Sequence, residues 1–271
     1  MAAVSAPASY LFVPATRPDR VAKATATNAD AVIVDLEDAV ALDDKAMARD
    51  TLAGLTVDRP CYVRVNGRST PQYDEDVAIV AGLSWVAGVV LPKTESADDV
   101  VALVARLPAD RAVLALVETA RGLTAVDGIA AAGPARLLFG SADYLADLGA
   151  SPGQDVLLYP RSRLVVASAA AGLAPPVDGP ALDLAAPERL REEGLHVKAL
   201  GFGGKLCIHP AQVEVVNELF RPTPEELAWA RRVLDAAATA SAGAFVVDGA
   251  MIDEPVLRRA RRLVAAPAPG E

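Results

Sequence analysis

The sequence predicts an α/β fold, a (β/α)8 (TIM) barrel, on three observations. The length of 271 residues is normal for a single barrel of this kind. Short aliphatic runs without strict polar alternation recur along the chain, which is typical of parallel strands that are buried on both faces. Amphipathic stretches separate these runs, and about eight strands alternating with helices is the number that closes such a barrel.

The predicted strands are short runs rich in valine, leucine and isoleucine. The seventh of them, Pro180–Leu184, carries the weakest signal because only its leucines and alanine are apolar. In chain order the runs are Tyr10–Pro14, Ala31–Asp35, Cys61–Val65, Gly88–Pro92, Ala112–Val117, Arg136–Gly140, Pro180–Leu184 and Lys205–His209.

Helical segments with one apolar face fill the intervals between the strands. The first, Pro18–Ala26, follows Thr16, whose hydroxyl suits a helix N-cap. Thr223-Pro-Glu-Glu226 combines a capping box with proline in the first turn, so a helix is expected from there to about Ala240. The other predicted helices are Asp43–Leu55, Ser96–Leu107, Ser162–Ala171 and a basic segment, Val256–Val264.

The alternative to a closed barrel is a doubly wound open sheet. No G-x-G-x-x-G motif follows the first strand, so a dinucleotide-binding fold gains no support. Within the barrel interpretation, we expect residues 1–240 to form the catalytic domain. Residues 241–271, which begin with a strand- or loop-like stretch around Gly243–Gly249, form a C-terminal extension.

Composition and charge exclude several classes of function. The formal net charge is −9, and nucleic-acid binding requires a basic footprint that the whole chain does not show. No apolar run approaches the roughly 20 residues that a membrane span needs, and no signal-peptide pattern opens the sequence. Cys61 and Cys207 both sit in apolar runs, so we expect buried free thiols and a cytoplasmic enzyme.

Polar residues follow one predicted strand after another. Because the carboxyl ends of the strands meet at one rim of a barrel, and active sites form at that rim, these side chains predict a site there. Charged groups at the end of a buried strand are usually paired or functional. The residues are Asp35, Glu37, Asp38, Arg64, Asn66, Lys93, Glu118, Asp143 and His209.

Glu118 and Asp143 are the predicted metal ligands. Two carboxylates from neighbouring strands suit Mg²⁺, which commonly binds one or two protein carboxylates together with water and substrate oxygens. Mn²⁺ accepts the same oxygen ligands. A zinc site is disfavoured because the chain has two histidines and no Cys-x-x-Cys. His209 is expected to act as a hydrogen-bonding residue at a strand end.

Two basic positions are candidates for contacts with an anionic substrate. Arg64 has the geometry to hold a carboxylate through two parallel hydrogen bonds. Lys23, with Arg17 and Arg20 on the first predicted helix, suits phosphate groups, although a solvated helix face explains the same pattern.

Motifs across nearly the whole chain, from Tyr10 to Arg262, resemble one family. They keep that family's order, so their combined signal is much stronger than any one of them. The stretches are Leu11–Pro14, Ile33–Val40, Val63–Asn66, Leu91–Lys93, Leu116–Ala120, Gly140–Asp143, Gly201–Lys205, Cys207–Gln212 and Met251–Pro255. On them the sequence resembles the citrate lyase β-subunit-like branch of the HpcH/HpaI aldolase/citrate lyase family, which includes CoA-ester lyases.

The resemblance implies a homotrimer or hexamer in which the C-terminal extension reaches a neighbouring subunit's site. Glu118 and Asp143 match the family's Mg²⁺ ligands, and Arg64 matches the arginine at the substrate carboxylate and carbonyl. Lys23 matches a position that contacts CoA. Asp253 matches a catalytic aspartate donated by the adjacent subunit, whereas the residues alone predict a helix cap there.

The activity implied is a reversible, Mg²⁺-dependent cleavage of a 3-hydroxyacyl-CoA thioester to acetyl-CoA and a 2-oxo acid. Malyl-CoA, citramalyl-CoA and citryl-CoA are the candidate substrates. Two alternatives stay open. One is a CoA-independent, metal-dependent aldolase for 2-oxo acids. The other is a citrate lyase β-subunit that acts only on a carrier-bound acyl group within a complex.

Overall fold

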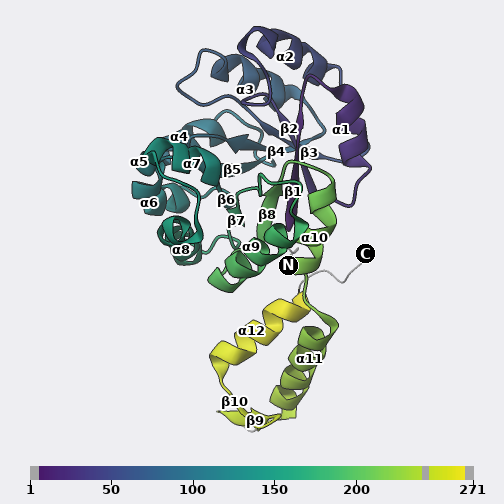
Figure 1. Cartoon of the computed structure of the whole chain (residues 1–271), viewed down its shortest axis with the longest axis vertical. Helices are drawn as coiled ribbons and strands as arrows, with labels where there is room; N and C mark the ends of the chain where they lie inside the picture. The colour runs from purple at the N-terminus through teal and green to yellow at the C-terminus, as the bar shows by residue number, and fades with distance from the viewer. Residues whose placement is uncertain (1–5, 240–243, 266–271) are drawn as a thin grey trace. The chain divides into compact units, whose positions relative to one another are not determined.

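The computed structural model describes residues 6–239 and 244–265. Within these ranges eight parallel strands form a closed barrel in chain order, β1 to β8, and β8 pairs with β1 to complete it. Figure 1 shows the helices placed around the outside of these strands. The strands are β1 (Ser9–Pro14), β2 (Ala31–Asp35), β3 (Cys61–Arg64), β4 (Val86–Leu91), β5 (Ala112–Val117), β6 (Arg136–Phe139), β7 (Val177–Asp178) and β8 (Gly204–Cys207). The predicted fold class is confirmed.

The helices follow the strands in the order expected of a (β/α)8 barrel. Ser96 caps α4 with the reciprocal hydrogen bonds of a capping box, which explains why this helix starts where the sequence indicated. The helices of the barrel are α1 (Pro18–Thr25), α2 (Lys45–Ala53), α3 (Tyr73–Gly82), α4 (Ala97–Val104), α5 (Ala120–Thr124), α6 (Val126–Ala131), α7 (Ser141–Leu148), α8 (Gln154–Ala170), α9 (Pro187–Leu200) and α10 (Ala211–Phe220). A short 3-10 helix, Leu42–Asp44, precedes α2.

Side chains from the strands fill the interior of the barrel. Tyr10, Ile33, Leu116 and Leu206 belong to one buried cluster to which most strands contribute. Successive side chains of a strand point to opposite faces. The residues between the core positions therefore face the surrounding helices, as Lys205 does.

Two predicted elements are wrong in position. The seventh strand is Val177–Asp178 and not Pro180–Leu184. Pro180 has no N–H to give to a strand ladder, and Leu182 and Leu184 are exposed rather than buried. Helix α8 begins at Gln154, eight residues before the predicted Ser162. The prediction began too late because Pro160, which usually ends or kinks a helix, lies inside this one.

The C-terminal segment forms a compact unit of its own. It contains α11 (Pro224–Thr239), the antiparallel strands β9 (Phe245–Val247) and β10 (Ala250–Ile252), and α12 (Glu254–Ala265). Asp248 and Gly249 both adopt positive φ in the hairpin turn, as a two-residue turn of this kind requires. A small core of its own holds the unit together, made by Ala230, Val233, Val247, Ile252 and Ala260.

The capping box at the start of α11 is confirmed, because Thr223 and Glu226 exchange backbone-to-side-chain hydrogen bonds of 2.9 and 3.1 Å. The predicted end of that helix at Ala240 and the predicted start of the hairpin at Gly243 lie outside the described residues. The compact barrel unit runs from Pro7 to Asn217, and the second unit begins at Glu218. The domain division at residue 240 stays a prediction.

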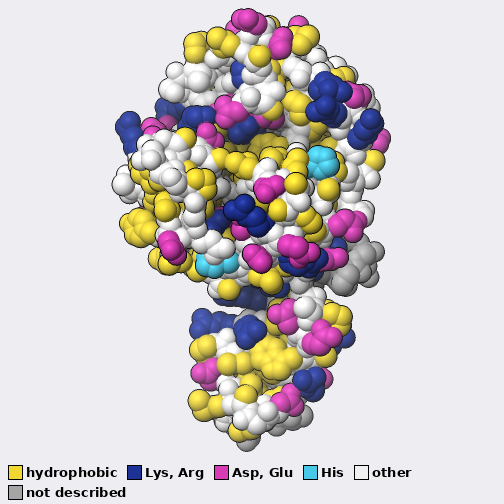
Figure 2. Space-filling view, in the orientation of Figure 1, with side chains coloured by type: hydrophobic (Ala, Val, Ile, Leu, Met, Phe, Trp, Pro, Cys, Tyr) yellow, Lys and Arg dark blue, Asp and Glu magenta, His cyan; other side chains and the backbone are white. Residues whose placement is uncertain are grey.

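Along the described ranges, no helix is long and apolar enough to cross a membrane. On the face of the barrel that Figure 2 shows, acidic and basic side chains of the described residues are interspersed.

Candidate active site

A cavity of about 360 Å³ lies at the carboxyl ends of the barrel strands. Asp35 and Arg64 enter it from the last positions of β2 and β3, and Glu118 follows β5. Asp143 reaches it from the first turn of α7, directly after β6. The structure therefore brings the predicted metal ligands and the predicted arginine into one cavity.

The backbone of Lys93 holds Glu118 in place. The N–H of Lys93 donates a hydrogen bond of 2.8 Å to Oε1 of Glu118, whose side chain is buried. Lys93 adopts a left-handed backbone conformation with φ of 48°. Such a conformation in a non-glycine residue costs on the order of 1 kcal/mol and is concentrated at functional sites. At this strand end the strain directs a backbone donor at the carboxylate.

Gly140 gives Glu118 its space. A Cβ added at Gly140 would lie 2.5 Å from the Cβ of Glu118 and would also overlap its Oε2. Only glycine fits between β6 and α7 at this point. The close approach packs Glu118 against the backbone that leads into Asp143.

The surroundings disfavour a negative charge on Glu118 when no cation is present. Burial is the largest cause, followed by the carboxylates of Glu37 and Asp143, and together they raise the pKa of Glu118 to about 8. A divalent cation would reverse this effect, since it compensates the crowded carboxylates directly.

The donor set fits Mg²⁺. Glu118 and Asp143 supply two carboxylates that face one cavity, and Mg²⁺ takes its other ligands from water and substrate oxygens. Among the residues that the structure describes, no group of three or more His, Cys, Asp or Glu side chains is arranged to hold a metal.

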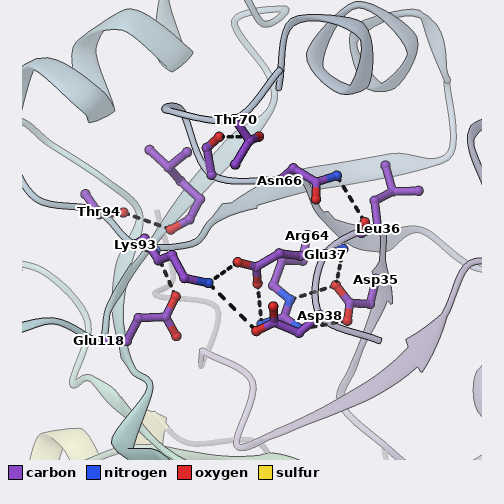
Figure 3. Close-up of polar contacts among 12 residues, drawn as sticks. Asp35, Leu36, Glu37, Asp38, Arg64, Asn66, Thr70, Lys93, Thr94 and Glu118 are labelled. Atoms are coloured by element: carbon purple, nitrogen blue, oxygen red, sulfur yellow. Dashed lines mark hydrogen bonds and ion pairs between the residues drawn. The ribbon is translucent and has the colours of Figure 1, made fainter. Parts of the chain in front are cut away.

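Arg64 is held by two acidic side chains, as Figure 3 shows. Its Nε and Nη2 donate to the two oxygens of Asp35 at 2.7 and 2.6 Å, and Nη1 pairs with Oε2 of Glu37 at 2.8 Å. Burial alone would lower the pKa of Arg64, but Asp35 and Glu37 together raise it above its ordinary value. The guanidinium therefore stays charged beside the cavity, at a distance of 4.8 Å from the ring of Phe12.

Glu37 connects this arginine to the lysine of the next strand. Lys93 Nζ donates to Oε1 of Glu37 and lies 3.8 Å from Asp38. Burial raises the pKa of Glu37 despite both cations. The ammonium of Lys45 in α2 donates to the carbonyl oxygens of Leu36 and Glu37 at 2.7 and 2.6 Å, which fixes the loop after β2.

Neither Lys45 nor the role of Gly140 was predictable from the sequence. Lys45 lies in a helix with nothing in its local pattern to distinguish it from a solvated lysine. Gly140 was visible within a motif, but its close contact with Glu118 joins residues 22 positions apart in the chain.

The remaining predicted residues lie elsewhere. Lys23 is exposed on α1 and does not line the cavity. Asp253 belongs to the C-terminal unit, where its Oδ1 accepts a hydrogen bond of 3.2 Å from the N–H of Val256. The predicted helix cap at Asp253 is confirmed, while its catalytic role stays a prediction. His209 is confirmed as a hydrogen-bonding residue, since its Nδ1 accepts from the N–H of Ala211 at 3.2 Å.

Comparison with known proteins gives the family. The family model described as HpcH/HpaI aldolase/citrate lyase matches residues 8–210, which span the barrel from β1 to the end of β8. The chain belongs to this family. The predicted reaction class, a carbon–carbon lyase, is confirmed at the level of the family.

Named relatives extend the match over nearly the full length. The citrate lyase subunit beta-like protein of Mycobacterium tuberculosis is 42% identical over 264 residues, which cover 94% of this chain and 93% of that protein. The L-malyl-CoA/beta-methylmalyl-CoA lyase of Rhodobacter capsulatus is 33% identical over 294 residues, covering 94% and 92%.

A solved structure supports the same conclusion. The crystal structure of protein CitE from Mycobacterium tuberculosis, in complex with magnesium, acetoacetate and coenzyme A, matches with a TM-score of 0.82 at 41% identity. The match covers 97% of this chain and 98% of that one. This family member binds magnesium and coenzyme A, the two ligands that the sequence predicted for this chain.

Proposed function

We propose that this chain is a Mg²⁺-dependent lyase that reversibly cleaves a 3-hydroxyacyl-CoA to acetyl-CoA and a 2-oxo acid. The observation that carries the proposal is the cavity at the strand ends, where Glu118, Asp143 and Arg64 meet. Malyl-CoA, citramalyl-CoA and citryl-CoA are the candidate substrates.

Glu118 and Asp143 would hold the metal. When bound, Mg²⁺ supplies Lewis-acid chemistry to the oxygens of the 2-oxo acid half of the substrate. Mn²⁺ serves in its place because oxygen ligands suit both ions. The N–H of Lys93 and the small Gly140 keep Glu118 in position for this task.

Arg64 orients the carboxylate of the 2-oxo acid. A guanidinium has five N–H donors, and the hydrogen bonds to Asp35 use two of them. Arg64 also lines the cavity that Glu118 and Asp143 enter. A fixed positive charge there stabilises the negative charge that develops as the carbon–carbon bond breaks.

A carboxylate completes the proton transfer. In cleavage, the bond between C2 and C3 of the acyl chain breaks and its electron pair passes into the thioester enolate, while the hydroxyl gives its proton to solvent water and becomes the 2-oxo group. Asp253 of a neighbouring subunit, which takes up a proton from solvent, then protonates the acetyl carbon, and it removes that proton in condensation. This role requires a homotrimer or hexamer in which the C-terminal extension reaches the next subunit.

The CoA portion meets the basic side chains of α1. Arg20 and Lys23 are exposed on this helix, and Arg17 is held by Asp19 at 3.0 Å. Exposed cations suit the phosphates of CoA. Cys61 and Cys207 are buried free thiols, which supports the proposal that the enzyme works in the reducing cytoplasm.

The test is an assay of purified protein with malyl-CoA, both enantiomers of citramalyl-CoA, and citryl-CoA, each with Mg²⁺, Mn²⁺ or a chelator. Equal amounts of acetyl-CoA and a 2-oxo acid, formed only with metal, support the proposal and name the substrate. Free CoA with an intact hydroxy acid would show thioester hydrolysis instead. Cleavage of free 4-hydroxy-2-oxo acids alone, or of carrier-bound acyl groups alone, would support one of the two alternatives.

A further inference from the structure

The charged side chains that line the cavity at the strand ends are nearly all acidic. Among the residues that the structure describes, Arg64 is the one cation of the lining, and it already pairs with Asp35 and Glu37. The acidic residues of the lining are Asp35, Asp38, Glu118 and Asp143. In the proposed function, Arg64 and the metal take the carboxylate next to the 2-oxo group. The described lining therefore offers no further cation to a second carboxylate.

Two lysines near the cavity are already bound to other partners, as Figure 3 shows for Lys93. Its Nζ donates to Glu37 and lies 3.8 Å from Asp38. Lys45 donates to two backbone carbonyl oxygens of the loop after β2, and neither lysine lines the cavity. The group that the proposed function brings in from a neighbouring subunit, Asp253, is itself a carboxylate. A second carboxylate on the 2-oxo acid would therefore meet an excess of negative charge, which opposes its binding.

The rest of the cavity wall is apolar. In the described part of the chain, the lining residues other than the five charged ones are glycine or have aliphatic or aromatic side chains, so none of these side chains donates a hydrogen bond. The largest are Phe12, Leu116, Leu182, Leu206 and Ile208. The volume of about 360 Å³ is in the range of sites for whole small molecules, so size does not exclude a substituent of several carbon atoms. Such a wall suits a hydrogen atom or an alkyl group on the 2-oxo carbon and disfavours a charged group.

We propose that this cavity selects 2-oxo acids with a single carboxylate and an uncharged, apolar substituent, and that Leu182 belongs to the wall that rejects a second carboxylate. The inference rests on the proposed function and narrows it. Malyl-CoA and citramalyl-CoA, which give glyoxylate and pyruvate, are then substrates, whereas citryl-CoA, which gives the dicarboxylate oxaloacetate, is not. An unpaired charge is a common means by which a site discriminates between similar ligands.

The test compares three 2-oxo acids in Mg²⁺-dependent condensation with acetyl-CoA: pyruvate, oxaloacetate and 4-methyl-2-oxopentanoate. The last carries an isobutyl group, which has as many non-hydrogen atoms and the same branching as the carboxymethyl group of oxaloacetate but no charge. Each product is identified by mass, because oxaloacetate loses CO₂ to form pyruvate in solution. The wild-type protein is expected to use pyruvate and the isobutyl acid, and to use oxaloacetate at least about 100-fold less efficiently, in kcat/KM, than the isobutyl acid.

Two variants locate the effect. Leu182→Lys places a cation in the wall, and the fold tolerates the change because Leu182 is 63% exposed. This variant is expected to raise kcat/KM for oxaloacetate relative to pyruvate about tenfold. Leu184→Lys is the matched control, since Leu184 lies on the same segment, is 53% exposed and does not line the cavity. In that variant the ratio should equal the wild-type ratio.

Use of oxaloacetate as efficient as that of the isobutyl acid would overturn the inference and leave the proposed function standing. Condensation of pyruvate alone, with both larger acids rejected, would also overturn it, because size and not charge would then be the cause. Equal ratios in Leu182→Lys and Leu184→Lys would remove Leu182 from the wall that selects the substrate. If no 2-oxo acid condenses and no CoA ester is cleaved, the proposed function fails and the inference with it.

Discussion

The barrel carries two clusters of charged side chains that differ in their balance of charge. At the strand ends, five carboxylates outnumber three cations; the carboxylates are those of Asp35, Glu37, Asp38, Glu118 and Asp143, and the cations those of Arg64, Lys45 and Lys93. Between the barrel wall and helices α8 and α9, Asp178 and Glu193 face Arg161 and Lys205 in equal number.

This difference in charge balance shifts the pKa of a carboxyl group in opposite directions in the two clusters. Burial raises the pKa of Glu118 to about 8, and no nearby cation offsets its acidic neighbours fully. Burial acts on Asp178 as well, but Lys205 and Arg161 outweigh it and lower the pKa of that carboxyl. A balanced cluster needs no further charge, whereas a cluster with excess negative charge needs a cation from outside.

The largest expected effect is a loss of stability when the carboxylate of the balanced cluster is removed. Asp178→Ala leaves Arg161 and Lys205 buried without their carboxylate, which is expected to lower the free energy of unfolding by about 3–5 kcal/mol. Denaturant titration followed by circular dichroism measures this change. Asp127→Ala removes the exposed partner of Arg163 and should cost less than about 1 kcal/mol. Equal effects of the two substitutions would show that Asp178 is no more important than a surface ion pair.

At the strand ends we expect the opposite pattern, in which a substitution lowers activity strongly but does not lower stability. Glu118→Gln removes a metal ligand and is expected to lower lyase activity at least about 100-fold. The same change removes a negative charge from a buried and crowded site, so the metal-free protein should be no less stable than wild type. Activity with Mg²⁺ and the midpoint of thermal unfolding with chelator are the two measurements. Full activity in Glu118→Gln would contradict the metal assignment.

Gly140→Ala tests the packing that positions Glu118. The added methyl group overlaps Glu118, so we expect a loss of about 1–3 kcal/mol in stability and weaker Mg²⁺ binding in calorimetric titration. Gly128→Ala in α6 is the matched control, because a Cβ there meets no atom within 4 Å. That control should be neutral or slightly stabilising. Equal Mg²⁺ affinity in the two variants would show that Gly140 does not help to position the metal site.

Local pattern was sufficient to predict most of the fold. The aliphatic runs at Ala31–Asp35 and Ala112–Val117 are strands with the predicted bounds, because parallel strands of a barrel are apolar on both faces. The seventh strand could not be located in this way. It has two residues, one of which is the charged Asp178, and its burial depends on Arg161 and Lys205 from other elements.

The candidate site was predictable where chemistry follows directly from strand order. Arg64 ends β3, Glu118 follows β5 and Asp143 follows β6, so closure of the barrel brings them to one cavity. The partners of Arg64 were not predictable, since its bidentate hydrogen bonds go to Asp35 across the β2–β3 pair.

The smallest expected effect is the change with pH in the contribution of Asp178 to stability. The pKa of Asp178 is lowered in the folded protein, so its contribution to stability is fully present above the ordinary carboxyl pKa of about 4 and is lost as the pH falls through the folded value. The difference in unfolding free energy between wild type and Asp178→Asn should therefore stay constant from about pH 5 to 7 and shrink below about pH 4. Urea titrations at a series of pH values measure it. A difference that grows as the pH falls would mean that Asp178 is protonated in the folded state and that this cluster, too, lacks positive charge.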